Sequence, residues 1–300
     1  WQAVCQVAGT EPLWEAMRRN TMKRQNMTRM TMLAAAGALL MASCGTGEVL
    51  GPPDIDTDDP LIQIHSEGGF VPVDWNLGRG PTFTVTQGGL IIYQGVTTLE
   101  YPGRLVPPYM AGQLNEEQLS ELIQKVKAMG IAEIEDEHDD SVTNVADATT
   151  EVIRFWDESG VHRYSVYALG ITDHDVPERT VAFADLFEWL HTVTGTIDAS
   201  PYEADRVQVI AGADYQGIDP DFVDIRDWPL DGENPDNWDE LTTVGEAEVW
   251  TCKVFDGGIP EVFEDATQAT LWTHPSESAD AQNYKLLVRA LLPGEDGCSL

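Results

Sequence analysis

The chain has 300 residues and a mass of 33.0 kDa, which is enough for one or two domains. It holds 51 Asp and Glu residues against 17 Lys and Arg residues, a formal charge of −34 at pH 7. A surface this acidic repels phosphate backbones and anionic lipid surfaces, which argues against nucleic-acid binding. No apolar run reaches the roughly 20 residues that cross a bilayer, which argues against a polytopic membrane protein.

The first 43 residues are typical of a targeting segment. We expect residues 1–21 to be an upstream, non-mature stretch, followed by a signal peptide over residues 22–43 that starts at Met22. Its positively charged start contains Lys23, Arg24 and Arg29. A short apolar run and a pair of small residues follow. These are the three parts of a secretory signal, so the sequence predicts export.

The end of this signal carries a more specific pattern. Leu40-Met41-Ala42-Ser43-Cys44 resembles the lipobox of bacterial lipoproteins, where small residues precede an invariant Cys. The resemblance implies that Cys44 receives a thioether-linked diacylglycerol and becomes the first mature residue, anchored in the cell membrane or envelope outside the cytoplasm. The alternative is ordinary secretion with Cys44 as a spare thiol. A chain that starts at Cys44 has 12 basic and 49 acidic residues, a net charge of −37.

Residues 44–62 and 63–199 differ in composition. The first stretch is rich in Gly, Pro and Asp without apolar periodicity, which predicts a flexible tether. In the second, Phe83–Thr86 and Leu90–Tyr93 flank a Gly-containing turn, which predicts a hairpin. A helix is expected from the Asn115 cap to Met129, with apolar residues on one face and Gly130 at its end.

A second hairpin and helix follow in the same order. Thr150–Trp156 and Val161–Leu169 are the expected strands, and the helix begins near Pro177 and ends at Gly195. Hairpins that alternate with helices predict an α+β fold for residues 63–199, with a mostly antiparallel sheet and two helices.

The segment from Phe83 to Ile131 resembles strand–turn–strand–helix units of uncharacterised, secreted bacterial envelope lipoproteins. The matching residues are Leu90, Ile91, Tyr93, Gly95, Leu114, Glu117, Gln118 and Leu122. This resemblance implies no particular activity.

Residues 200–300 are predicted to form a smaller, β-rich C-terminal region. Its expected strands are 207–210, 246–255, 268–274 and 284–292, with a long Pro-, Asp- and Trp-rich loop over residues 218–243. Cys252 and Cys298 are expected to form one disulfide, because export leaves them as a pair beside Cys44. We expect a separate module; the alternative is that these strands extend the first sheet.

The long loop carries the strongest candidate ligands. Asp231, Glu233, Asp236 and Asp239 can converge if the turns at Gly232 and Pro235 fold them inward, and oxygen ligands of this kind suit Ca²⁺. A solvated acidic loop is the alternative. Trp228 and Trp238 either stack on sugar rings or pin the loop to the core. The acidic run Glu133–Asp140, which includes His138, is a weaker metal candidate.

No catalytic motif identifies an enzyme in this chain. The common hydrolase, metalloprotease and phosphate-loop patterns are missing, and Cys298, close to the end of the sequence, is poorly suited as a nucleophile. We therefore predict a lipid-anchored, non-enzymatic binding module for an unknown protein or glycan ligand, without a required cofactor. Two alternatives stay open: an anchored hydrolase of cell-wall or extracellular glycan, and a Ca²⁺-dependent binding module.

Overall fold

The computed structural model describes residues 57–97, 101–142, 145–171, 176–213, 218, 221–241, 249–275 and 282–298. All of them belong to one compact unit, and they contain no helix that is long and apolar enough to cross a membrane. The expected signal peptide, the lipid site at Cys44 and most of the expected tether lie outside the described residues.

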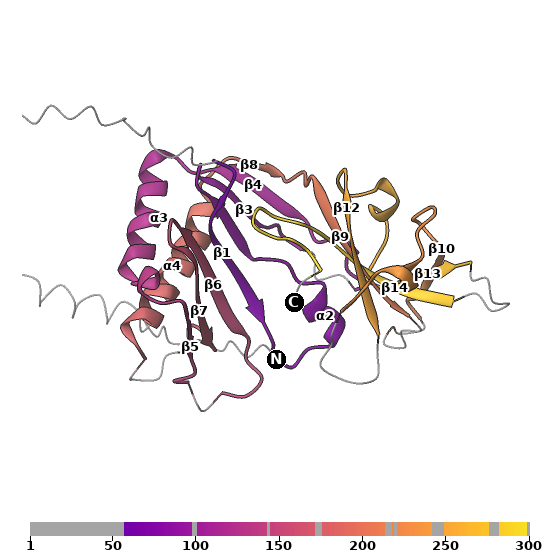
Figure 1. The fold of residues 1–300 in the computed structure, drawn as a ribbon, viewed down its shortest axis with the longest axis horizontal. Coiled ribbons are helices and arrows are strands. Elements are labelled where there is room, and N and C mark those ends of the chain that lie inside the picture. Colours follow the sequence, from indigo (N-terminus) through magenta and orange to yellow (C-terminus); the bar gives the residue numbers. More distant parts are fainter. Residues whose placement is uncertain are drawn as a thin grey trace, which may run out of the picture. The chain divides into compact units, whose positions relative to one another are not determined.

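The described residues form two sheets, and the first accounts for the predicted α+β region (Figure 1). Its eight strands run in the spatial order β5 (Asp136–Asp139), β7 (Gly160–Tyr167), β6 (Thr150–Asp157), β1 (Pro60–Glu67), β2 (Phe83–Thr86), β3 (Leu90–Gln94), β4 (Tyr109–Gln113) and β8 (Ala199–Pro201). Only the pairing of β5 with β7 is parallel. Strand β1 starts at Pro60, so the last three residues of the expected tether belong to the sheet.

Two long helices cover one face of this sheet (Figure 1). Helix α3 (Glu116–Ala128) begins with the predicted capping box between Asn115 and Gln118. Helix α4 (Glu178–Thr194) lies between the cap residues Pro177 and Gly195, as the sequence indicated. Their apolar faces bury Leu122, Phe183 and Leu186 against residues of β1, β2, β6 and β7, and burial of this kind supplies most helix stability in proteins. A short helix, α2 (Val73–Leu77), follows β1.

The second sheet is the predicted β-rich C-terminal region. Its spatial order is β10 (Asp224–Asp227), β13 (Thr270–His274), β14 (Gln282–Ala290), β9 (Arg206–Ala213), β12 (Trp250–Asp256) and β11 (Asp239–Leu241). Short 3-10 turns cover Ile131–Glu133, Pro235–Asn237 and Glu261–Phe263. Trp250 on β12 faces Gly212 on β9, where an added Cβ would stand 2.6 Å from the indole ring. Glycine at this position lets the buried indole lie flat on the neighbouring strand.

The two sheets share contacts. A small apolar cluster joins Ile92 and Tyr109 of the first sheet to Ala290 at the end of β14 and to Leu292 just after it. The buried ammonium of Lys285 on β14 donates to the carboxylate of Asp74 on α2. That residues 200–300 form a separate module stays a prediction.

Candidate functional site

An aromatic cluster pins the long acidic loop onto the second sheet. Trp228 packs 5.6 Å from the ring of Tyr284 and 5.0 Å from His274, measured between centroids, and Trp238 lies 5.8 Å from Phe255. The indole of Trp228 donates to the carbonyl of Leu230 at 2.9 Å. Trp238 is buried, so these side chains act mainly as the loop's own core.

An open pocket of about 440 Å³ lies beside this cluster. Its wall is formed by Gly232, Glu233, Asn234, Asn237, Trp238, Asp239, Cys252 and Lys253. Glu233 accepts from the ammonium of Lys253 at 2.6 Å and from the indole N–H of Trp238 at 3.2 Å. The Lys253 bond is the main reason that the pKa of Glu233 lies below its usual value. The pocket therefore presents a fixed carboxylate–ammonium pair, two amides and the edge of an indole.

The four acids predicted to bind Ca²⁺ are used in different ways. Glu233 is paired as described, and Asp236 accepts from the hydroxyl of Tyr284 at 2.7 Å. Asp231 and Asp239 are exposed. Across the described residues, no three His, Cys, Asp or Glu side chains form a group that could hold a metal ion. The geometry gives the calcium prediction no support, because two of the four carboxylates already have protein donors that a metal would have to displace.

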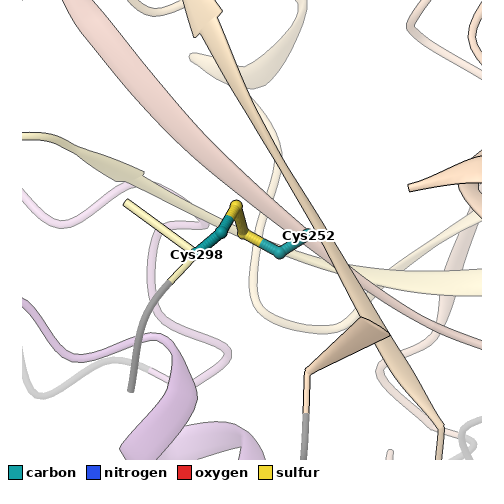
Figure 2. The surroundings of a disulfide bond; sticks show 2 residues. All are labelled: Cys252 and Cys298. Atoms are coloured by element: carbon teal, nitrogen blue, oxygen red, sulfur yellow. A yellow bond between two sulfur atoms is a disulfide. The ribbon is translucent and has the colours of Figure 1, made fainter. Parts of the chain in front are cut away.

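The disulfide predicted from the cysteine count is present. Cys252 on β12 is bonded to Cys298 near the end of the chain, with the two Cα atoms 5.5 Å apart (Figure 2). Cys252 is fully buried and lies in a small apolar cluster with Leu241 and Trp250. The bond ties the C-terminal tail to the strand that forms one wall of the pocket.

The turn between β6 and β7 brings together an Asp, a Ser and a His. The hydroxyl of Ser159 donates to Asp157 at 2.6 Å, and the Nε2 atom of His162 lies 3.0 Å from that hydroxyl and 3.1 Å from the same carboxylate oxygen. The Nδ1 atom of His162 bonds to the carbonyl of Ile134. In a catalytic triad the Ser and the acid contact opposite ring nitrogens. Here both contact Nε2, so the group locks a hairpin turn.

The pKa values of this turn group are shifted by its own bonds. Hydrogen bonds from Ser159, with a contribution from His162, lower the pKa of Asp157 to about 2. The bond to the Ile134 carbonyl, reinforced by Asp157, raises the pKa of His162.

The acidic run at Glu133–Asp140 makes structural contacts, and among the described residues it belongs to no group of three ligands that could hold a metal ion. Asp139 is buried and accepts from the hydroxyl of Thr180, which also contacts the hydroxyl of Tyr164 at 2.7 Å. Burial opposes ionisation of Asp139, but the bonds from Thr180 and Ser141 outweigh it and lower its pKa. Asp139 thus fastens the edge strand β5 to helix α4. The sequence showed the acid but not its partner, which lies 41 residues away.

Comparison with known proteins adds no relative: no family model, no curated protein and no solved structure matches the chain.

Proposed function

We propose that this chain is an exported, lipid-anchored envelope protein whose folded unit binds a ligand without transforming it. The observation that carries the anchor is the segment from Met22 to Cys44, with its basic start, short apolar run and small residues before the cysteine. The presence of the Cys252–Cys298 bond supports an oxidising location outside the cytoplasm, where structural disulfides persist.

The arrangement of polar groups favours binding over catalysis. The carboxylate of Glu233 is held ionised by Lys253, which makes it a poor proton donor for glycoside hydrolysis. In the group of Asp157, Ser159 and His162, the serine hydroxyl donates to the carboxylate and both contact Nε2, which differs from the arrangement of a catalytic triad. These geometries favour a binding module over the anchored hydrolase.

The pocket beside Trp238 is the proposed ligand site. Asn237 and Asp239 line it, are exposed, and make no side-chain hydrogen bond within the described residues. A polar ligand with several hydroxyl or amide groups, such as a glycan segment, would find donors and acceptors beside an indole edge.

The anchor is tested by expressing the full chain in a bacterium and separating membrane from soluble protein. The unaltered chain should sediment with the membranes, and Cys44→Ala should release it into the soluble fraction of the envelope. Equal incorporation of radiolabelled fatty acid into the unaltered chain and into Cys44→Ala would refute the anchor.

The pocket is tested with a panel of cell-wall and extracellular oligosaccharides. Loss of one hydrogen bond is worth about 1 kcal/mol, so Asn237→Ala should weaken binding roughly fivefold. Asn76→Ala, an exposed amide outside the pocket, should leave binding unchanged and is the matched control. Equal effects of the two variants would argue against the pocket, and release of new reducing ends would restore the hydrolase alternative.

A further inference from the structure

The segment from Gly68 to Gly80 exposes an unusual amount of apolar surface. Phe70 is 87% exposed, Trp75 is 50% exposed, and Val71 and Val73 are exposed between them. We call these four residues the apolar rim. Contiguous exposed apolar residues of this size usually mark an interaction surface.

The charge of this segment differs from that of the rest of the protein. Its only acid is Asp74, whose side chain is 13% exposed and is paired with the buried Lys285. Its only cation is Arg79, whose guanidinium lies 5.8 Å from the ring centre of Trp75. On a chain with a large excess of acids, this segment therefore presents apolar groups and one partly exposed cation, whose guanidinium has one buried nitrogen. Aromatic side chains beside a cation suit the boundary between acyl chains and anionic lipid headgroups.

The rim lies at one end of the first sheet. Glu67 at the end of β1 pairs with Thr150, which pairs in turn with Tyr167 at the end of β7. The rim follows β1, and Ile171, which is 50% exposed, follows β7 at that same end. In Figure 1, α2 lies beside the tip of the β1 arrow. The rim and Ile171 therefore lie at the same end of the sheet.

The chain between Cys44 and the fold is long enough to let this end reach the anchoring membrane. Twelve residues separate Cys44 from Thr57, and fully extended they span at most about 40 Å. The eight residues of β1, which separate the chain's entry into the fold from the rim, span about 26 Å. The reach exceeds the length of the strand, so an anchor at Cys44 is compatible with contact between the rim and the same bilayer.

We infer that the apolar rim inserts into the surface of the membrane that holds the anchor, with Arg79 at the headgroups. This inference rests on the proposed anchoring and adds a second contact that orients the folded unit. One lipid attachment point alone does not set the orientation of the folded unit. With the second contact, the same face of the unit would always point toward the bilayer.

The test uses a photo-crosslinking benzoylphenylalanine placed at Val73, with Val161 as the matched control position. Val161 is 49% exposed and lies at the opposite end of the sheet, beside the turn between β6 and β7. The purified lipidated chain is reconstituted into vesicles of phosphatidylethanolamine and phosphatidylglycerol, irradiated and analysed by mass spectrometry. We expect phospholipid adducts at position 73 to exceed those at position 161 several-fold. In Phe70→Ser/Trp75→Ser, the adducts at 73 should fall to the level at 161.

Equal lipid adducts at the two positions would overturn the inference. Adducts at position 73 to a second copy of the chain, in place of lipid, would overturn it too. A parallel preparation replaces Cys44 with a polyhistidine tag held by nickel-chelating lipid in the same vesicles. This preparation tests membrane contact of the apolar rim in the absence of lipidation. The mass of the N-terminal peptide from the bacterial preparation tests the lipid anchor. The two experiments therefore distinguish failure of the rim proposal from failure of the anchor proposal.

Discussion

Removal of the disulfide should destabilise the protein by an amount that depends on the length of the loop that the bond closes. The bond joins residues 46 positions apart, and the entropy of closing a loop of this size corresponds to about 4 kcal/mol at 25 °C. Cys298→Ala is the cleaner perturbation, because Cys252 is fully buried and its loss would also remove packing against Trp250. The sheet should survive, since β12 remains paired with β9 along its whole length.

The assay is thermal unfolding of residues 45–300, which contain the folded unit and lack both the signal segment and the lipid site. In a chain of this size 1 kcal/mol shifts the melting temperature by about 2–4 °C, so Cys298→Ala should lower it by roughly 8–16 °C. The reducing agent dithiothreitol should produce the same shift in the parent protein and none in the variant. A drop below about 2 °C would refute the reasoning.

Three further predictions concern packing, pH and salt. Gly212→Ala should cost about 1–3 kcal/mol in denaturant unfolding, because the new methyl group meets the Trp250 ring; an unchanged midpoint would contradict this packing. Because folding raises the pKa of His162, this group stabilises the fold below about pH 6.5, and its contribution is lost as the pH rises through the folded-state pKa. Because folding lowers the pKa of Asp157, this group stabilises the fold above about pH 3.8, and its contribution is lost as the pH falls toward 2. His162→Gln should therefore flatten the upper limb of the stability curve, and it should also weaken the acid limb, because His162 contributes to the lowered pKa of Asp157. An unaltered upper limb would exclude this group as its cause. CaCl₂ and NaCl at matched ionic strength should raise the melting temperature equally by screening the acidic surface, whereas a rise specific to Ca²⁺ would restore Asp231, Glu233, Asp236 and Asp239 as a metal site.

Local sequence signals predicted the parts of the fold that local physics determines. The Gly-containing turn placed the hairpin of β2 and β3, and the Asn115 cap and Gly130 set the limits of helix α3. Elements whose stability comes from distant partners were missed. Strand β1 was not recognised, because its Pro60 follows an Asp-rich stretch and its place between β2 and β6 depends on strands far along the chain. Strand β10, Asp-Ile-Arg-Asp, is held in the sheet by its parallel neighbour β13.

The candidate site shows the same division. Cysteine parity was enough to predict the Cys252–Cys298 bond. The acids of the long loop were visible, but their partners were not: Glu233 meets Lys253 20 residues away, and Asp236 meets Tyr284 48 residues away. The carboxylates of Glu233 and Asp236, which have no visible partner in the local sequence, thus already accept hydrogen bonds in the fold. Because of these hydrogen bonds, the structure has a polar pocket at the loop for which the sequence predicted an ion site.

The central claim is the anchor at Cys44, and the mass of the N-terminal peptide tests it most directly. The full chain is expressed in a bacterium, purified from membranes and digested. We predict a first peptide that begins at Cys44 and carries the added mass of a diacylglyceryl group, with residues 1–43 removed. An unmodified Cys44, or a mature chain that begins at another residue, would contradict the account.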